Sequence, residues 1–248
     1  MKIICQTVAV VALLLSRATI MAVDSAHPPL PPVETVLERL VEQSQTEATN
    51  ELAFKQRYCF TRSKTNEVRN SRGELNKREV KTQVNKPSPK PGKHDDAPET
   101  QTHTRGRPDR KSDFTVEREF LQRFEVTLGG RETLNGRPAL ILDLVPAPKK
   151  PPAHDLKDRI INKMAGRAWV DEAEWVLVQG DFHLTEKVNV VAGLVGAIAK
   201  FTLTFNRTRT ADGLWFTHHL DWHLEGREIF VYRTMDAHDE ISGLQLAR

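Results

Sequence analysis

Cysteine is scarce in this chain of 248 residues, which contains only Cys5 and Cys59. Cys5 lies in an N-terminal segment that we predict to be removed on export, so the mature chain would keep one thiol and form no internal disulfide. Cys59 has no evident histidine partner, and we interpret it as a packed side chain and not as a nucleophile. The stability of the fold is therefore expected to come from a hydrophobic core.

Catalytic motifs are missing as well. The sequence has no GxSxG, phosphate-binding loop, GxGxxG or HExxH motif. Asp143 follows an apolar run, but no acid or base partner stands beside it, and we interpret it as a polar residue at a strand end. We therefore expect no enzymatic activity and no cofactor, with a metal-dependent hydrolase as a further alternative.

A large excess of one charge is also lacking, because the formal net charge is only +3 at pH 7. The basic residues are scattered, and no aromatic residues alternate with them as a single-strand nucleic-acid binder requires. We therefore expect no nucleic-acid partner.

No hydrophobic run is long enough to cross a bilayer as a helix, which takes about 20 residues. Residues 3–15 form a mostly apolar run after Lys2, and small residues follow, which is the three-part pattern of a secretory signal peptide. We predict a signal peptide at residues 1–22, cleaved after Ala18 or Ala22. The mature protein is then exported, periplasmic and not integral to the membrane. The alternative is an uncleaved membrane anchor.

The distribution of apolar and polar residues predicts one helix and one polar insertion in the first half of the chain. Apolar residues at helical spacing form one face, which predicts a single N-terminal helix: Val33, Val36, Leu37, Leu40 and Val41. Residues 85–113 are rich in proline, lysine and aspartate without apolar periodicity, and we predict a disordered insertion there. It would interrupt a single domain of residues 33–248.

In the second half of the chain, apolar and polar residues alternate, which predicts at least seven antiparallel strands. Asn135 and Gly136 mark one hairpin turn, and residues 171–174 mark another. In the strand that follows, alternation would place Val178 and Phe182 on one face. The predicted fold class is α+β, mostly β: a curved antiparallel sheet, or half-open β-barrel, packed against one N-terminal helix and short additional helices.

The segment FTHHLDWHL gathers three histidines and an aspartate. At the period of a strand, His219, Asp221 and His223 share one face, and Leu220 and Trp222 share the other. Two imidazoles and a carboxylate can bind a metal, but polar residues are also what a solvated sheet face requires. We predict a solvated polar face and no metal site, with weak metal binding as the alternative.

A curved sheet covered by one helix would leave a concave apolar surface, and such surfaces accommodate acyl chains or other apolar ligands. The predicted lining consists of Phe124, Leu140, Leu142, Phe182, Leu203, Phe205, Leu220 and Trp222. The alternative is that the helix fills the concavity. Residues 188–198, which are apolar and rich in small side chains, are interpreted as a buried helix or crossover, or as a flap over the cavity.

Two stretches, GRETLNGRPALILDLVPAP and INKMAGRAWVDEAEWVLVQGDFHLTEKV, resemble exported bacterial proteins of the outer-membrane lipoprotein-sorting superfamily, which includes LolA, LolB and RseB. The resemblance covers residues 33–234 and implies a half-open β-barrel closed by helices around an apolar cavity. In the carriers such a cavity holds lipoprotein acyl chains. The resemblance therefore implies a periplasmic protein that binds a lipid, a lipoprotein acyl chain or another apolar ligand. The polar insertion departs from the family pattern, and the alternative is an envelope sensor or scaffold that binds a protein partner.

Overall fold

A computed structural model describes residues 28–87, 114–190, 196–228 and 231–247. Every described helix and strand belongs to the unit of residues 31–248. The predicted signal peptide and residues 88–113 of the predicted insertion lie outside the described residues. The described part of residues 188–198 forms strands, so the interpretation as a buried helix is wrong there.

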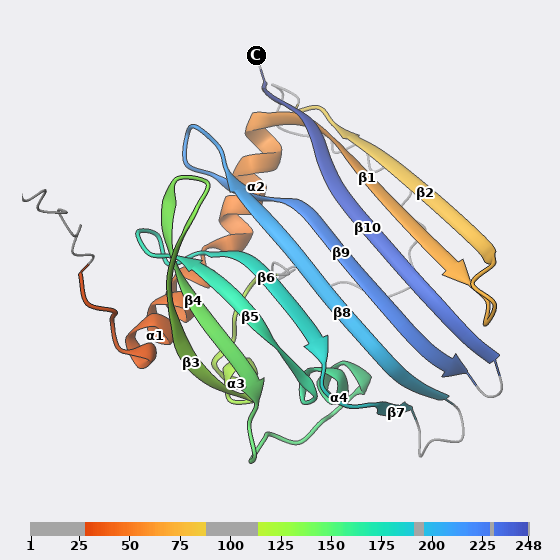
Figure 1. Cartoon of the computed structure of the whole chain (residues 1–248). Helices are drawn as coiled ribbons and strands as arrows, with labels where there is room; N and C mark the ends of the chain where they lie inside the picture. The colour runs from red at the N-terminus through yellow and green to blue at the C-terminus, as the bar shows by residue number, and fades with distance from the viewer. Residues whose placement is uncertain (1–27, 88–113, 191–195, 229–230, 248) are drawn as a thin grey trace, which may run out of the picture. The chain divides into compact units, whose positions relative to one another are not determined.

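The described strands form one antiparallel sheet of ten strands (Figure 1). Their order across the sheet is β2-β1-β10-β9-β8-β6-β5-β4-β3, and β7 pairs with β8. The strand bounds are β1 Tyr58–Arg69, β2 Leu75–Asn85, β3 Phe124–Leu134, β4 Arg137–Pro146, β5 Met164–Asp171, β6 Leu177–Leu184, β7 Val188–Val190, β8 Gly196–Arg209, β9 Trp215–Glu228 and β10 Val231–Leu246. Since β2 and β3 lie at opposite edges, the sheet is open. The predicted mostly β fold class is confirmed.

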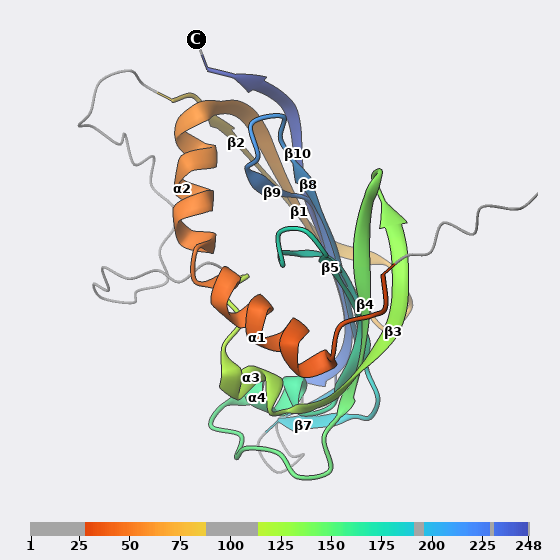
Figure 2. The same ribbon diagram turned by 90° about the vertical axis from the view of Figure 1, so that its left-hand side faces the viewer.

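Helices pack on one face of this sheet, which we call the helix side; the other is the outer face (Figure 2). The helix bounds are α1 Val33–Ser44, α2 Glu47–Arg57, α3 Arg118–Leu121 and α4 Leu156–Ile161. The short helices α3 and α4 contribute side chains that pack against the same core as α1. Among the described residues, no helix has both the length and the apolar character needed to cross a membrane.

The predicted N-terminal helix is confirmed as α1, and α2 is a separate, additional helix that follows it, with Gln45 and Thr46 between the two. The amides of Gln45 and Thr46 bond to carbonyl oxygens three residues back, which tightens the end of α1. Ser44, the last residue of α1, is buried, and its Oγ accepts a hydrogen bond of 3.0 Å from the amide of Val116. A contact with a distant part of the chain therefore fixes the end of α1.

The larger core cluster lies between α1 and strands β3 to β6. Val36 and Leu40 of α1 are 0% and 4% exposed, and Leu140 and Leu142 of β4 in the same cluster are 0% and 2% exposed. Burying a side chain of this size contributes about 1.5–3 kcal/mol. These contacts therefore hold α1 firmly on the β3–β6 half of the sheet.

A second core cluster holds α2 against β1, β9 and β10. Phe54 of α2 stacks on Phe216 of β9, with ring centroids 4.8 Å apart. Glu47 of α2 forms a buried ion pair with Arg207 of β8, with oxygen–nitrogen distances of 2.8 and 2.7 Å. Because Phe216 stands near the start of β9, α2 covers one end of these strands and not their full length.

Two local predictions concern hairpins. Asn135 and Gly136 have φ angles of 51° and 77°, the left-handed values that a type I′ turn requires, so the predicted turn is confirmed. The shared face predicted for Val178 and Phe182 is wrong. The β5–β6 register shifts next to Trp169, and Val178 packs with Trp169 while Phe182 packs against the core under α1. A β-bulge therefore reverses the alternation within β6.

Candidate functional site

The pairing of β8, β9, β10 and β1 places apolar side chains in adjacent rows on the helix side. Residues directly opposite each other in antiparallel strands point to the same face. Read from β8 to β1, the first row is Phe201, Leu224, Met235 and Val68, the second is Leu203, Trp222, Ala237 and Asn66, and the third is Phe205, Leu220, Asp239 and Lys64. We call six half-buried members of these rows the apolar face: Phe201, Leu203, Leu220, Trp222, Leu224 and Met235.

The apolar face is continuous with the two cores. Phe201 packs against the core under α1, and its ring centroid lies 6.5 Å from that of Trp222. Phe216, which shares the side of β9 that carries Trp222, is buried under α2. The apolar face thus begins where the buried clusters end, and its side chains are half-buried rather than enclosed.

The structure separates the eight predicted lining residues into two groups. Phe124, Leu140 and Leu142 are buried in the core that α1 covers. The other five lie on β6, β8 and β9: Phe182, Leu203, Phe205, Leu220 and Trp222. Phe205 is buried against the rings of Phe114 and Phe182, and the remaining four are half-buried. Side chains of α1 therefore fill the concavity beside β4, and apolar surface is left beside β8 and β9.

Two glycines make room for aromatic rings at the border of the apolar face. Gly180 lies opposite Phe205, and a Cβ atom there would collide with the rings of Phe205 and Phe182. Gly166 lies opposite Phe182, and a Cβ atom there would collide with that ring and with the carbonyl oxygen of Asp181. The rings therefore lie over bare backbone, an arrangement that a larger residue at either position would prevent.

Charged residues border the apolar face on the β1 side. Asp239, which lies opposite Leu220, accepts hydrogen bonds of 2.7 and 2.6 Å from the guanidinium of Arg62. The Nζ atom of Lys64 lies 3.5 Å from the same carboxylate, and the Lys64 side chain is 48% exposed. A ligand on the apolar face would meet apolar side chains along β8 to β10 and cationic groups at β1.

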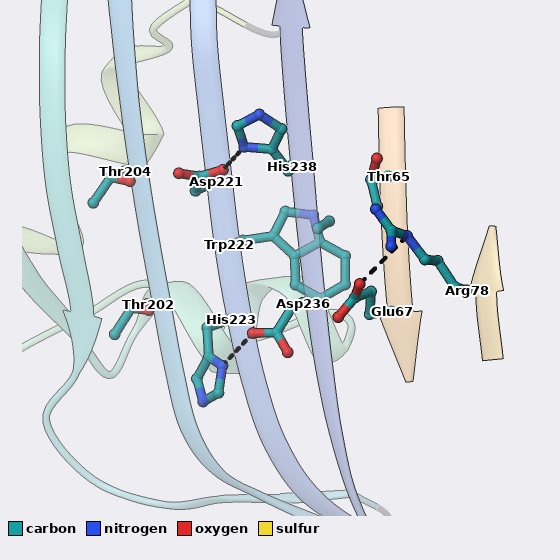
Figure 3. Close-up of a pocket in the computed structure, with 11 residues that line it drawn as sticks. Thr65, Glu67, Arg78, Thr202, Thr204, Asp221, Trp222, His223, Asp236 and His238 are labelled. Atoms are coloured by element: carbon teal, nitrogen blue, oxygen red, sulfur yellow. Dashed lines mark hydrogen bonds and ion pairs between the residues drawn. The ribbon is translucent and has the colours of Figure 1, made fainter. Parts of the chain in front are cut away.

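The outer face of the same strands is polar, which confirms the division of FTHHLDWHL into two faces. Figure 3 shows Asp221 facing His238 and His223 facing Asp236, at distances of 2.6 and 2.7 Å. These four residues help to line a hollow of about 490 Å³. Sequence reasoning missed the two β10 residues, although they repeat the every-second-residue pattern of the segment on β9.

The carboxylates of the outer face raise the pKa of the imidazoles beside them. The hydrogen bond to Asp221 raises the pKa of His238 above its ordinary value. Burial would lower the pKa of His223, but hydrogen bonds to Asp236 and Glu225 outweigh this effect, and the pKa is raised. Each of these carboxylates therefore stabilises a positive charge next to it.

No family model matches the chain, and no curated protein does. Solved structures match it at low identity. An outer membrane lipoprotein-sorting protein domain from Vibrio parahaemolyticus is 15% identical, with 84% of this chain and 92% of that chain covered and a TM-score of 0.32. A LolA superfamily protein from Nitrosomonas europaea is 10% identical, with 88% and 95% covered and a TM-score of 0.32.

A third match is the complex of MucA and MucB from Pseudomonas aeruginosa, at 10% identity, with 86% of this chain and 98% of that chain covered and a TM-score of 0.25. At these identities the likeness concerns the fold alone.

Proposed function

We propose that the chain is an exported, periplasmic protein that binds an extended apolar chain, such as the acyl chain of a lipid or lipoprotein, without catalysis. The observation that carries this proposal is the apolar face, whose half-buried side chains lie in adjacent rows across β8, β9 and β10. Export is supported by the signal-peptide pattern of residues 1–22.

Transfer of the ligand from water would drive binding. Each methylene group removed from water contributes about 0.8 kcal/mol, so about ten methylenes contribute roughly 8 kcal/mol. Association costs about 4–15 kcal/mol in lost motional freedom and ordering. A simple acyl chain is therefore expected to bind weakly, and a longer chain or a second chain would bind more tightly.

The charged border suggests how such a ligand would lie. Strands are spaced about 4.8 Å apart, so the rows from β8 to β1 span roughly 14 Å. An acidic head group would sit at β1 near Lys64 and Asn66. The tail would follow the second row over Ala237, Trp222 and Leu203 toward β8, and so would not cover the carboxylate of Asp239. The polar group would then remain at the exposed end of the row while the tail is buried.

A direct test is a titration of the purified full chain with a fatty acid that carries a dansyl group, followed by fluorescence. Leu203→Glu is expected to weaken binding by at least about tenfold, because the tail would have to cover a carboxylate. Thr202→Glu is the matched control: it adds the same charge one residue away, on the outer face and opposite His223, and should leave binding unchanged.

The proposal fails if the wild-type chain binds no dansyl fatty acid and an organic extract of the purified protein contains no lipid. It fails equally if Leu203→Glu and Thr202→Glu weaken binding to the same extent, since binding would then not depend on the apolar face.

A second candidate function is that of an envelope sensor or scaffold that binds a protein partner through β2. In the described residues β2 pairs on one side only, with β1, and it exposes Leu75, Val80 and Val84. A strand of a partner could add to that edge through main-chain hydrogen bonds. Val80→Pro would then abolish the complex in an envelope cross-linking experiment and leave fatty-acid binding intact.

A further inference from the structure

We propose that His219, Asp221 and His238 form a binding site for a divalent transition-metal ion, such as Zn²⁺, on the outer face of the sheet. The three side chains come from the neighbouring strands β9 and β10. The site lies on the opposite face of β9 from Leu220 and Trp222, so it does not depend on the apolar ligand proposed above.

Backbone pairing brings the three side chains together. Asp221 lies directly opposite His238, and His219 stands two residues away from Asp221 on the same face of β9. Nε2 of His219 is 2.5 Å from Oδ2 of Asp221, and Nδ1 of His238 is 2.6 Å from Oδ1 of Asp221. The three candidate ligand atoms all lie within 4.8 Å of one another.

A metal ion requires only small movements of these side chains. Bonds of about 2.0–2.1 Å at tetrahedral angles place the ligand atoms of a zinc site about 3.3 Å apart. Each pair of atoms therefore has to move by about 1.5 Å or less, which side-chain rotation provides. The two imidazole rings already lie edge to face, with centroids 4.6 Å apart, so both nitrogens can approach one point beside Asp221.

The donor atoms select the kind of ion. Two imidazoles with one carboxylate suit Zn²⁺, Ni²⁺ or Cu²⁺, whereas Mg²⁺ and Ca²⁺ prefer oxygen ligands alone. The proton that each imidazole shares with Asp221 would be released when the ion takes its place. Three protein ligands leave a further position for water or for a group from another molecule.

Glu240 supports His238 from its other side. Its Oε2 atom lies 3.6 Å from Nε2 of His238, the ring nitrogen that would not bind the ion. Histidines that bind metals commonly donate this second N–H to a carboxylate, which fixes the ring and strengthens the ligand. The side chains of His219, Asp221 and His238 are 34–45% exposed, so an ion in solution can reach them.

This trio differs from the other polar clusters of the sheet. In the described part of the chain, no second group of three histidine, cysteine, aspartate or glutamate side chains brings its ligand atoms as close together. His223, on the same face of β9, instead contacts the carboxylates of Asp236 and Glu225. That cluster offers a single imidazole, so it lacks the two nitrogen ligands that favour a transition metal.

The test is a calorimetric titration of the full chain with Zn²⁺, after purification with a tag that contains no histidine. One ion per chain is expected to bind, and millimolar Mg²⁺ should not displace it. Loss of a carboxylate that contacts a metal-binding histidine typically lowers the affinity for the metal about 10- to 100-fold. This loss is the expected effect of Glu240→Gln. His219→Ala and His238→Ala each remove a ligand and should weaken binding by more than about 100-fold.

His218→Ala is the matched control, because His218 is exposed and lies on the helix side of the same strand. It should leave Zn²⁺ binding unchanged, and dansyl fatty-acid binding should be unchanged in His219→Ala. The proposal is overturned if the wild-type chain binds no Zn²⁺, or if His218→Ala weakens binding as much as His219→Ala. Should the ligand variants unfold by circular dichroism, X-ray absorption of the wild-type zinc complex decides: two imidazole ligands support the site, and fewer refute it.

Discussion

Replacing Leu142 with alanine should destabilise the fold much more than the same change at Leu203, although both leucines lie on the helix side of one sheet. Leu142 is 2% exposed and belongs to the core that α1 covers. Leu203 is half-buried in the apolar face. The pair of variants therefore tests whether α1 fills one half of the concavity and leaves the other half accessible.

The expected magnitudes follow from the two environments. Leu142→Ala loses buried methyl groups and leaves a closed cavity, which together cost about 2–5 kcal/mol. Leu203→Ala loses only part of the roughly 1.5–3 kcal/mol that complete burial of a leucine contributes, so about 1 kcal/mol is expected. For a domain of this size each kcal/mol lowers Tm by about 2–4 °C, which predicts losses of about 4–20 °C for Leu142→Ala and about 2–4 °C for Leu203→Ala.

Urea unfolding followed by circular dichroism measures both changes, provided that the slope with denaturant is the same in the two variants. Binding of the dansyl fatty acid should show the opposite order, with Leu203→Ala weakened and folded Leu142→Ala unchanged. Equal losses of stability, or weaker binding in Leu142→Ala than in Leu203→Ala, would refute the division into a filled and an accessible half.

Two further predictions concern charged groups near α2. Hydrogen bonds from Thr210 and Tyr58 hold the pKa of Asp212 at about 2, below its ordinary value of 3.8. The stabilisation from this lowered pKa is present above pH 3.8 and is lost as the pH falls through about 2. The urea midpoint of Asp212→Asn should therefore fall less than that of the wild type over this range. Glu47→Gln breaks the buried ion pair with Arg207 and should cost about 3–5 kcal/mol in urea unfolding, while a loss below about 1 kcal/mol would show that the pair is effectively solvated.

Much of the local structure could be predicted from the sequence. Asn135 and Gly136 tolerate left-handed backbone angles, so their turn follows from residue type alone. The side-chain period of a strand also assigned Asp221 and Trp222 to opposite faces before any partner strand was known. The bulge beside Val178 could not be foreseen, because it depends on how β6 pairs with β5.

The candidate metal site depends on how the consecutive strands β9 and β10 pair. His238 joins His219 and Asp221 only because β10 pairs with β9 in one register, and a shift by one residue would turn its side chain to the other face. The sequence therefore identified His219 and Asp221 as neighbours on one face, but it did not identify His238 of β10 as their partner.

Outside the bulge in β6, the sequence by itself determined which side chains of a strand share a face, because alternation along a regular strand is a property of the local backbone. Only the tertiary structure decided which apolar residues are enclosed. Leu140 and Leu203 belong to similar strands, yet α1 covers the first and not the second. The physical reason is that the burial of a strand residue depends on where a helix ends and on which strands it packs. The end of α1 is fixed by the hydrogen bond between Ser44 and Val116, which lie far apart in the chain.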